Sequence, residues 1–143
     1  MNLKLTIVLR SLLGLIFVAG PVAAMLHVGE PVGLPTEAAA FAGALAKTGY
    51  LMPLLWSTEI VAGLMLLSGI LVPIALLLLA PVVVNIALFH AFLAPAGAGL
   101  AVLVIGLEIF LAWQYRRAFE PLFVLRAGFG RPHDLASVKR QAA

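Results

Sequence analysis

Residues 48–95 constrain the fold of this chain more than any other stretch. They form about fifty residues of almost unbroken apolar sequence, with one acidic residue, Glu59, and no Lys or Arg. The hydrocarbon core of a bilayer is about 30 Å thick, so a helix needs about 20 apolar residues to cross it. The stretch is long enough for two crossings, and Ser68, Gly69 and Pro73 are typical of a turn between them. We therefore expect a transmembrane helical hairpin here.

The rest of the chain also has the composition of a membrane protein. Hydrophobic residues make up 64% of the sequence and charged residues 10%, whereas charged residues are about a quarter of a soluble domain. Four apolar segments are long enough to span a bilayer, at residues 5–26, 49–70, 73–94 and 99–119. The sequence therefore predicts an all-α fold, a four-helix transmembrane bundle over residues 1–120 followed by a cytoplasmic tail over residues 121–143.

The charged residues and the missing cysteines narrow the function. The sequence contains no cysteine, which excludes disulfide exchange, iron–sulfur ligation and covalently attached haem. The net charge is +3, but the Lys and Arg residues lie mainly at the segment ends and in the tail, so we expect a lipid bilayer as partner and no nucleic acid. Because the cytoplasmic side carries the excess of positive residues, the basic tail and the four crossings place both termini in the cytoplasm.

The N-terminal segment allows two interpretations. Lys4 and Arg10 flank the start of a short apolar run that ends near Ala23 and Ala24, which is also the pattern of a cleavable signal peptide. The apolar run continues to Leu26, however, and so reaches spanning length. We expect a retained first helix, and cleavage of this segment stays open as the alternative.

Residues 36–47 predict a short helix in the first loop, on the outer side of the membrane. Thr36 is a typical N-cap residue, and Glu37 in the first turn and Lys47 in the last turn both suit the helix dipole. The segment is too short to span a bilayer. Phe41 and Leu45 are four residues apart and share one face, which we expect to rest on or dip into the membrane surface.

Two carboxylates, Glu59 and Glu108, lie near the middle of the second and fourth crossings. A charged carboxylate at mid-bilayer costs about 3 kcal/mol, so each must be neutralised, paired or close to water. In a structural interpretation, one of them pairs with Arg10 or is protonated and hydrogen-bonded, and so fixes helix packing. In a functional interpretation, both are catalytic groups that exchange protons during quinone reduction or transport. The sequence leaves both interpretations open.

Asn85 and His90 are candidate cofactor-binding residues toward the outer end of the third crossing. Their separation of five residues is about 140° around an ideal helix, so they do not share one ligand face. His90 suits a hydrogen bond to a neighbouring helix, or a b-type haem shared with His27, which also follows the outer end of a crossing. No His-x-x-x-His or Glu-x-x-His spacing supports a metal site, so we expect no metal and disfavour haem.

Arg10 and Trp56 complete the candidate cofactor-binding residues. Arg10 lies about a third of the way into the membrane, from where its long side chain reaches either the inner surface or Glu59. Gly14 and Gly63 allow two helices to approach closely, or they leave a slot for a quinone ring beside Trp56. Small residues at transmembrane interfaces usually serve packing, so we favour the first of these two interpretations.

The order and spacing of several motifs resemble those of the DoxX family of small four-helix membrane proteins. The motifs are Arg10 with LLGLIFVAG, Phe41 and Leu45 ahead of TGYL, then TEIVAGLMLLSGILVP, and NIALFHAFLAP before a short last helix. The resemblance covers nearly the whole chain, and its family-like positions are Arg10, Glu59, Asn85 and His90. It implies a multi-pass protein of the bacterial cytoplasmic (inner) membrane and a partnership in a quinone-linked redox complex.

Three functions are compatible with these residues. The first is a membrane subunit of a quinone-linked electron-transfer or oxidoreductase complex, in which a redox partner protein supplies the redox centre and this chain is at most a non-catalytic or quinone-binding subunit. The second is a small proton-coupled transporter that uses Glu59 and Glu108. The third is a structural assembly protein without chemistry of its own. The sequence leaves open whether the chain forms a homo-oligomer.

Overall fold

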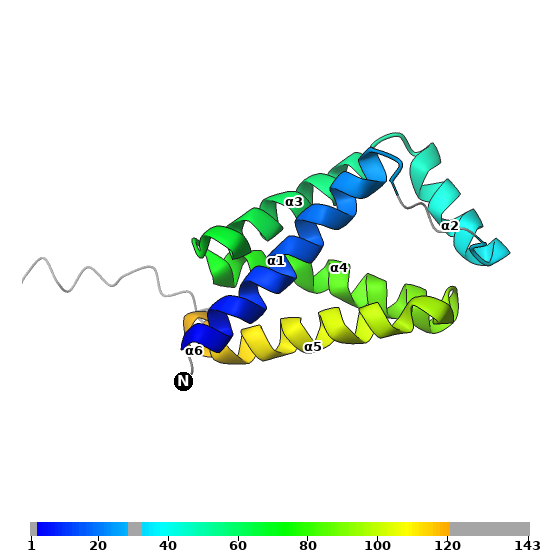
Figure 1. Ribbon diagram of the computed structural model, residues 1–143. Coiled ribbons are helices and arrows are strands. Elements are labelled where there is room, and N and C mark those ends of the chain that lie inside the picture. The colour runs from blue at the N-terminus through cyan, green and yellow to red at the C-terminus, as the bar shows by residue number, and fades with distance from the viewer. Residues whose placement is uncertain (1–2, 29–32, 121–143) are drawn as a thin grey trace, which may run out of the picture.

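The computed structural model describes residues 3–28 and 33–120, which form helices and no strands. The helices are α1 (Leu3–Met25), α2 (Thr36–Lys47), α3 (Leu51–Ser68), α4 (Val72–Phe92), the 3-10 helix η1 (Pro95–Gly97), α5 (Ala98–Gln114) and α6 (Arg116–Phe119) (Figure 1). By length and composition α1, α3, α4 and the continuous η1–α5 segment can each cross a membrane. The predicted all-α four-helix bundle is therefore confirmed. The predicted tail, residues 121–143, lies outside the described residues.

The four long helices form a ring in chain order. α1 packs on α3, α3 on α4, α4 on α5 and α5 on α1, so α3 and α5 lie diagonally opposite each other. Successive crossings alternate in direction (Figure 1). One end of the bundle, which we call the tail end, holds the start of α1, the α3–α4 turn and α6. The other end, the loop end, holds α2 and η1.

The tightest helix contact joins α1 and α3 through two glycines. A Cβ atom added to Gly14 would lie 2.8 Å from the Gly63 carbonyl oxygen, and one added to Gly63 would lie 2.8 Å from the Gly14 carbonyl oxygen. Such close backbone contact is how small residues drive helix association in membranes, where no hydrophobic effect acts between helices. Phe17, which is buried, packs beside the same contact. The close approach expected from Gly14 and Gly63 is therefore confirmed.

The α3–α4 turn has the predicted position and a backbone that requires glycine at one residue. Gly69 follows the last residue of α3 with a φ of 78°, and its N–H donates to the Met65 carbonyl at 3.0 Å. Leu71, just before α4, also has a positive φ, of 55°. Pro73 lies in the first turn of α4, where its missing N–H costs no hydrogen bond. The turn therefore reverses the chain within three residues.

α2 covers the predicted residues 36–47, but the expectation that Thr36 caps it is wrong. Pro35 holds the N-cap position, no side chain caps the helix, and the Pro35 carbonyl accepts a hydrogen bond from the Ala39 N–H at 2.9 Å. Thr36 is thus the first residue of the helix rather than its cap. Pro35 can hold the N-cap position because its ring fixes φ, here at −53°, and this value is compatible with a residue that precedes a helix. The face expected to meet the membrane surface faces the bundle instead, where the Phe41 ring lies 5.9 Å from the Phe89 ring of α4.

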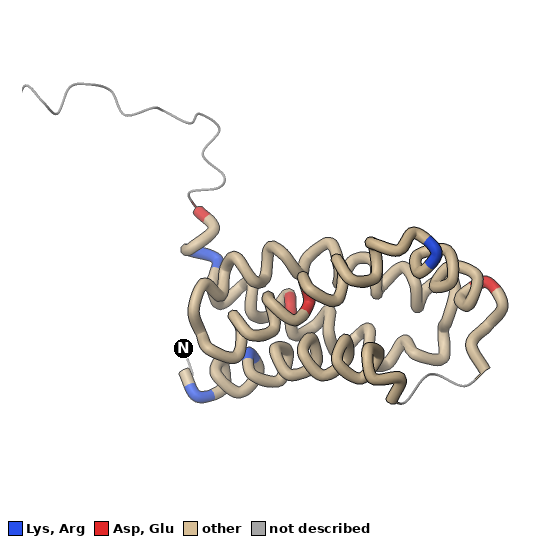
Figure 2. The backbone as a smooth tube through the Cα atoms, turned by 90° about the horizontal axis from the view of Figure 1, so that it is seen from above, with Lys and Arg blue, Asp and Glu red and all other residues tan. Residues whose placement is uncertain are grey.

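The outer surface of the four long helices is apolar, as contact with lipid requires. Large hydrophobic side chains are exposed on every one of them, for example Leu15, Leu64, Val84 and Val102. Lys and Arg lie mainly toward the two ends of the bundle, whereas acidic positions also occur in its middle (Figure 2). The chain is therefore a multi-pass integral membrane protein with carboxyl groups at membrane depth.

Candidate functional site

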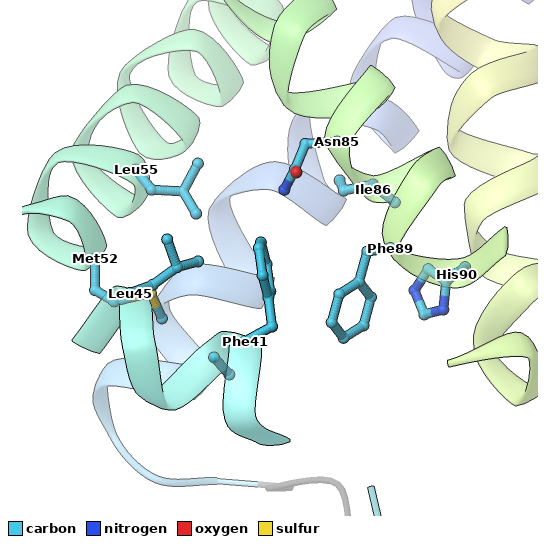
Figure 3. Close-up of a pocket in the computed structure, with 9 residues that line it drawn as sticks. Phe41, Leu45, Met52, Leu55, Asn85, Ile86, Phe89 and His90 are labelled. Atoms are coloured by element: carbon cyan, nitrogen blue, oxygen red, sulfur yellow. The ribbon is translucent and has the colours of Figure 1, made fainter. Parts of the chain in front are cut away.

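A pocket at the loop end is lined by three helices and open on one side, and we call it the α2–α4 pocket (Figure 3). Its volume is about 200 Å³, and it is lined by Phe41, Ala42 and Leu45 of α2, Met52 and Leu55 of α3, and Asn85, Ile86, Phe89 and His90 of α4. A second hollow of about 240 Å³ shares three of these residues and continues along Leu88, Phe92 and Leu93. The pocket is thus apolar, carries two polar side chains and continues toward the exposed surface of α4.

Aromatic rings form the wall of the α2–α4 pocket nearest α4. Phe41 and Leu45 both face it because they are four residues apart on α2, and Asn85 and Phe89 have the same spacing on α4. The Phe41 and Phe89 ring centroids are 5.9 Å apart at an interplanar angle of 43°. The His90 ring meets Phe89 edge to face, at 5.2 Å and 84°. These distances are those of favourable aromatic pairs, so α2 is held on the bundle by the pocket wall itself.

Asn85 is an exposed residue whose amide lines this pocket. Its side chain points into the space beside Phe41 and Leu55 (Figure 3), and it makes no hydrogen bond with any residue in 3–28 or 33–120. An amide carries two donor hydrogens and an acceptor oxygen, and leaving them unpaired in an apolar environment costs free energy. The amide is therefore available to a ligand that enters the pocket.

His90 is fixed at the end of α4 by the turn that follows it. Its Nδ1 lies 2.9 Å from the Ala94 carbonyl oxygen, which can only accept, so Nδ1 carries the hydrogen and Nε2 remains as an acceptor in the neutral ring. A Cβ atom added to Gly97 would lie 2.2 Å from the His90 ring, so the ring packs directly on that glycine. His90 therefore makes a hydrogen bond as expected, but the expected partner is wrong: the acceptor is in the turn after α4 and not on a neighbouring helix. Although Asn85 and His90 lie on different faces of α4, both line the pocket.

A second concave site, the Glu108 groove, runs between α4 and α5 toward the tail end. Its volume is about 480 Å³, and it is lined by Leu76, Leu77, Ala80, Glu108, Ile109, Ala112, Trp113, Arg116 and Phe119. Glu108 is 8% exposed, and its Oε2 is buried without a hydrogen-bond partner. The Arg116 guanidinium lies over the Trp113 ring at 5.0 Å and donates to the Trp113 carbonyl at 3.0 Å. The groove therefore has a carboxyl on its floor and a paired guanidinium at its end.

Arg10 does not form the ion pair that one interpretation of the sequence expects. Its guanidinium packs against the α3–α4 turn, where a Cβ atom added to Gly69 would lie 2.3 Å from a guanidinium nitrogen. Its Nε is buried without a partner, and neither Glu59 nor Glu108 makes a hydrogen bond or ion pair with any residue that the structure describes. The Arg10 side chain has thus turned toward the tail end rather than toward the carboxyl groups.

The remaining predicted residues lie apart from both cavities. Glu59 and Trp56 are half-buried on α3 and line neither the α2–α4 pocket nor the Glu108 groove. His27 is exposed just after α1, with a φ of 53°. The structure thus brings Asn85 and His90 together at one cavity and places Glu108 at another, rather than gathering all the polar residues in a single site.

The sequence interpretation did not identify three residues that shape these cavities. Phe89 follows Asn85 by four residues, which is the spacing that could have marked it as the wall beside the amide. Trp113 and Arg116 are three residues apart on consecutive turns, a spacing that brings a guanidinium onto an indole ring.

The described residues show no cluster that would bind a metal, and the comparisons with known proteins identify no site either. No group of three or more His, Cys, Asp or Glu side chains converges within residues 3–28 and 33–120. Comparison with protein-family models, with curated proteins and with solved structures gives no match.

Proposed function

We propose that this chain is a DoxX-like subunit of a quinone-linked electron-transfer or oxidoreductase complex in the bacterial cytoplasmic membrane, with both termini in the cytoplasm. In this proposal the α2–α4 pocket holds the quinone headgroup. The observation that supports it best is the amide of Asn85, which has no partner among the described residues and points into an aromatic-walled pocket at the loop end of the bundle. A lipid-soluble carbonyl compound matches both the apolar lining and the free amide donors.

Different pocket residues bind different parts of the quinone. Phe41 and Phe89 offer a surface on which a flat ring packs, and the Asn85 amide donates a hydrogen bond to a ring carbonyl. The adjoining hollow along Leu88 and Phe92 leads to the exposed face of α4, which gives an isoprenoid tail a path into lipid. The headgroup is thus held between α2 and α4 while the tail stays in the bilayer.

His90 is the proton-exchanging group of this site. Oxidation of a quinol releases two electrons and two protons. His90 lines the pocket and its Nδ1–H is already bonded to Ala94, so Nε2 is the ring atom that accepts one proton, and the other passes to water at the loop end. The chain has no cysteine for an iron–sulfur cluster or a thiol couple. We therefore assign the electrons to a redox partner protein bound to this subunit.

Photolabelling tests the location of the headgroup. A short-chain azidoquinone, added to the protein in nanodiscs and illuminated, should label peptides from α2 and from residues 85–93, and unlabelled quinone should compete. Asn85→Leu removes the amide at similar volume and should weaken competition about tenfold, since one hydrogen bond is lost in an apolar site. Gln114→Leu removes an amide at the tail end and is the matched control. Labelling outside the pocket, or equal affinity in Asn85→Leu, would refute the assignment.

A further inference from the structure

The Glu108 groove is separate from the pocket assigned to the quinone. It lies between α4 and α5 toward the tail end, whereas the α2–α4 pocket lies at the loop end. Leu77, Ile109 and Trp113 on its walls are exposed, so the groove opens sideways toward lipid. On its floor, the Glu108 carboxyl is more than nine-tenths buried and its Oε2 has no partner. A molecule that enters from the membrane therefore meets apolar walls and one unsatisfied carboxyl.

The elements that pack against α5 provide no counter-charge for this carboxyl. α4 carries no Asp, Glu, Lys or Arg, and its His90 is at the opposite end. On α1, Lys4 lies near the start of the helix and Arg10 packs on Gly69. Arg116 of α6 is eight residues beyond Glu108, about 12 Å along a helix, and it is held by Trp113. The nearby Arg117 and Glu120 also lie beyond the end of α5.

A carboxyl group at membrane depth is neutral only when a proton or another cation accompanies it. A neutral lipid would pack on the apolar walls of the groove but bring no positive charge to compensate an ionised Glu108, and an anionic lipid would place a second negative charge near Glu108. A cation with an apolar body satisfies both the walls and the floor. We propose that the Glu108 groove binds a hydrophobic organic cation from the bilayer, whose charge takes the place of the proton on the Glu108 carboxyl.

Exchange of proton and cation at one carboxyl has a measurable consequence. When the cation binds, the groove keeps its net charge, so a proton leaves the protein for each cation that enters. Affinity for the cation therefore falls as the pH is lowered, because protons compete for the same oxygen atoms. Glu59 is at a similar depth on the diagonal helix α3 but does not line the groove, so it takes no part in this exchange.

Trp113 reports on the groove directly. The chain has two tryptophans, Trp56 and Trp113, so a Trp56→Phe background leaves only the indole on the groove wall. In nanodiscs of zwitterionic lipid at mildly alkaline pH, dodecyltrimethylammonium should change the Trp113 fluorescence saturably and release protons into weakly buffered solution. Dodecyldimethylamine oxide has the same chain and a similar headgroup without net charge, and it should bind at least about tenfold more weakly.

Three variants decide the outcome. Glu108→Gln keeps the shape of the side chain and should lose cation binding at least about tenfold together with the proton release. Ala80→Phe adds a ring to the groove and keeps the Glu108 carboxyl in the chain, so it should block binding even if Glu108→Gln folds poorly. Glu59→Gln removes the other intramembrane carboxyl and should bind as the background protein does. Equal binding of the amine oxide, unchanged binding in Glu108→Gln or Ala80→Phe, or an equal loss in Glu59→Gln would each overturn the proposal.

Discussion

The α1–α3 pair and the α4–α5 pair are both antiparallel pairs in the same bundle, yet they pack in opposite ways. Between α1 and α3, Gly14 and Gly63 bring the two backbones into contact and leave no room for even a methyl group. Between α4 and α5, larger side chains such as Leu76 and Ile109 border a groove of about 480 Å³. The atoms nearest Gly14 and Gly63 are backbone and apolar side-chain atoms, whereas the open pair places the buried Glu108 on the lining of its groove.

The two helix pairs therefore contribute differently to the stability of the bundle and to binding. Helices in lipid gain little from the hydrophobic effect, so close backbone packing such as that at Gly14 and Gly63 supplies much of the free energy that holds them together. An unpartnered carboxyl does the opposite, because its desolvation opposes folding. The α1–α3 pair is therefore expected to stabilise the bundle, and the α4–α5 pair to give up stability for binding.

The largest change in the free energy of unfolding should come from adding a side chain at the α1–α3 contact. In Gly63→Val, the added Cβ would meet both the Gly14 carbonyl oxygen and a Val18 methyl at 2.8 Å, so the helices must separate. We expect a loss of about 3 kcal/mol in the free energy of unfolding, the upper part of the range for overpacking. Thermal unfolding followed by circular dichroism in detergent measures it.

Gly106→Val is the matched control for this substitution. Gly106 is also a helical glycine, but nothing lies within 4 Å of a Cβ atom placed there. Its substitution should change the free energy of unfolding by less than about 0.5 kcal/mol, as surface substitutions usually do. If Gly63→Val and Gly106→Val unfold at the same temperature, the close contact does not stabilise the bundle.

A smaller change in the free energy of unfolding, this time an increase, should come from replacing Glu108 in the α4–α5 pair. Glu108→Met replaces an unpartnered buried carboxyl by an apolar side chain of similar length, so it should raise the free energy of unfolding by about 2 kcal/mol. Urea or SDS unfolding of the ligand-free protein measures the change. Glu59→Met, at a half-buried position, should stabilise less. A destabilised Glu108→Met protein would mean that the carboxyl stabilises the bundle, so the α4–α5 pair would not give up stability for binding.

The sequence predicted the helices, and a close helix approach at Gly14 and Gly63, because both depend on local patterns. Apolar runs of spanning length define the crossings, and Gly69 with Pro73 defines the α3–α4 turn. Gly14 and Gly63 predicted a close approach because only glycine permits backbone contact. Each of these predictions needs no knowledge of which helix faces which.

The candidate site could be predicted only in part, because its cavities depend on how three helices meet. Asn85 and His90 were identified as polar residues in hydrocarbon, but the enclosing Phe41 comes from α2, whose position over α4 no local pattern specifies. The Arg10 side chain is long enough to reach either the inner membrane surface or Glu59. Its direction depends on the space left beside Gly69. Side-chain directions of this kind follow from tertiary packing.

The smallest effect should come from the α3–α4 turn, which joins the closed pair to the open pair. In Gly69→Ala, the left-handed φ of 78° is strained for a residue with a Cβ atom, so we expect a loss of about 1 kcal/mol in the free energy of unfolding. The Arg10 guanidinium would also have to shift, but it is the end of a flexible side chain and should move at little cost. Gly43→Ala in the open interior of α2 is the control and should be neutral or stabilising.

Repeating the turn substitution in an Arg10→Met background separates the two causes of its cost. If the backbone strain dominates, Gly69→Ala should cost the same in both backgrounds, because methionine removes the guanidinium but leaves φ unchanged. If the cost disappears with Arg10, then side-chain contact rather than glycine geometry defines the turn. In that case Arg10 would be part of the link between the two helix pairs, and its buried Nε would be a requirement of this packing rather than a spare donor for a ligand.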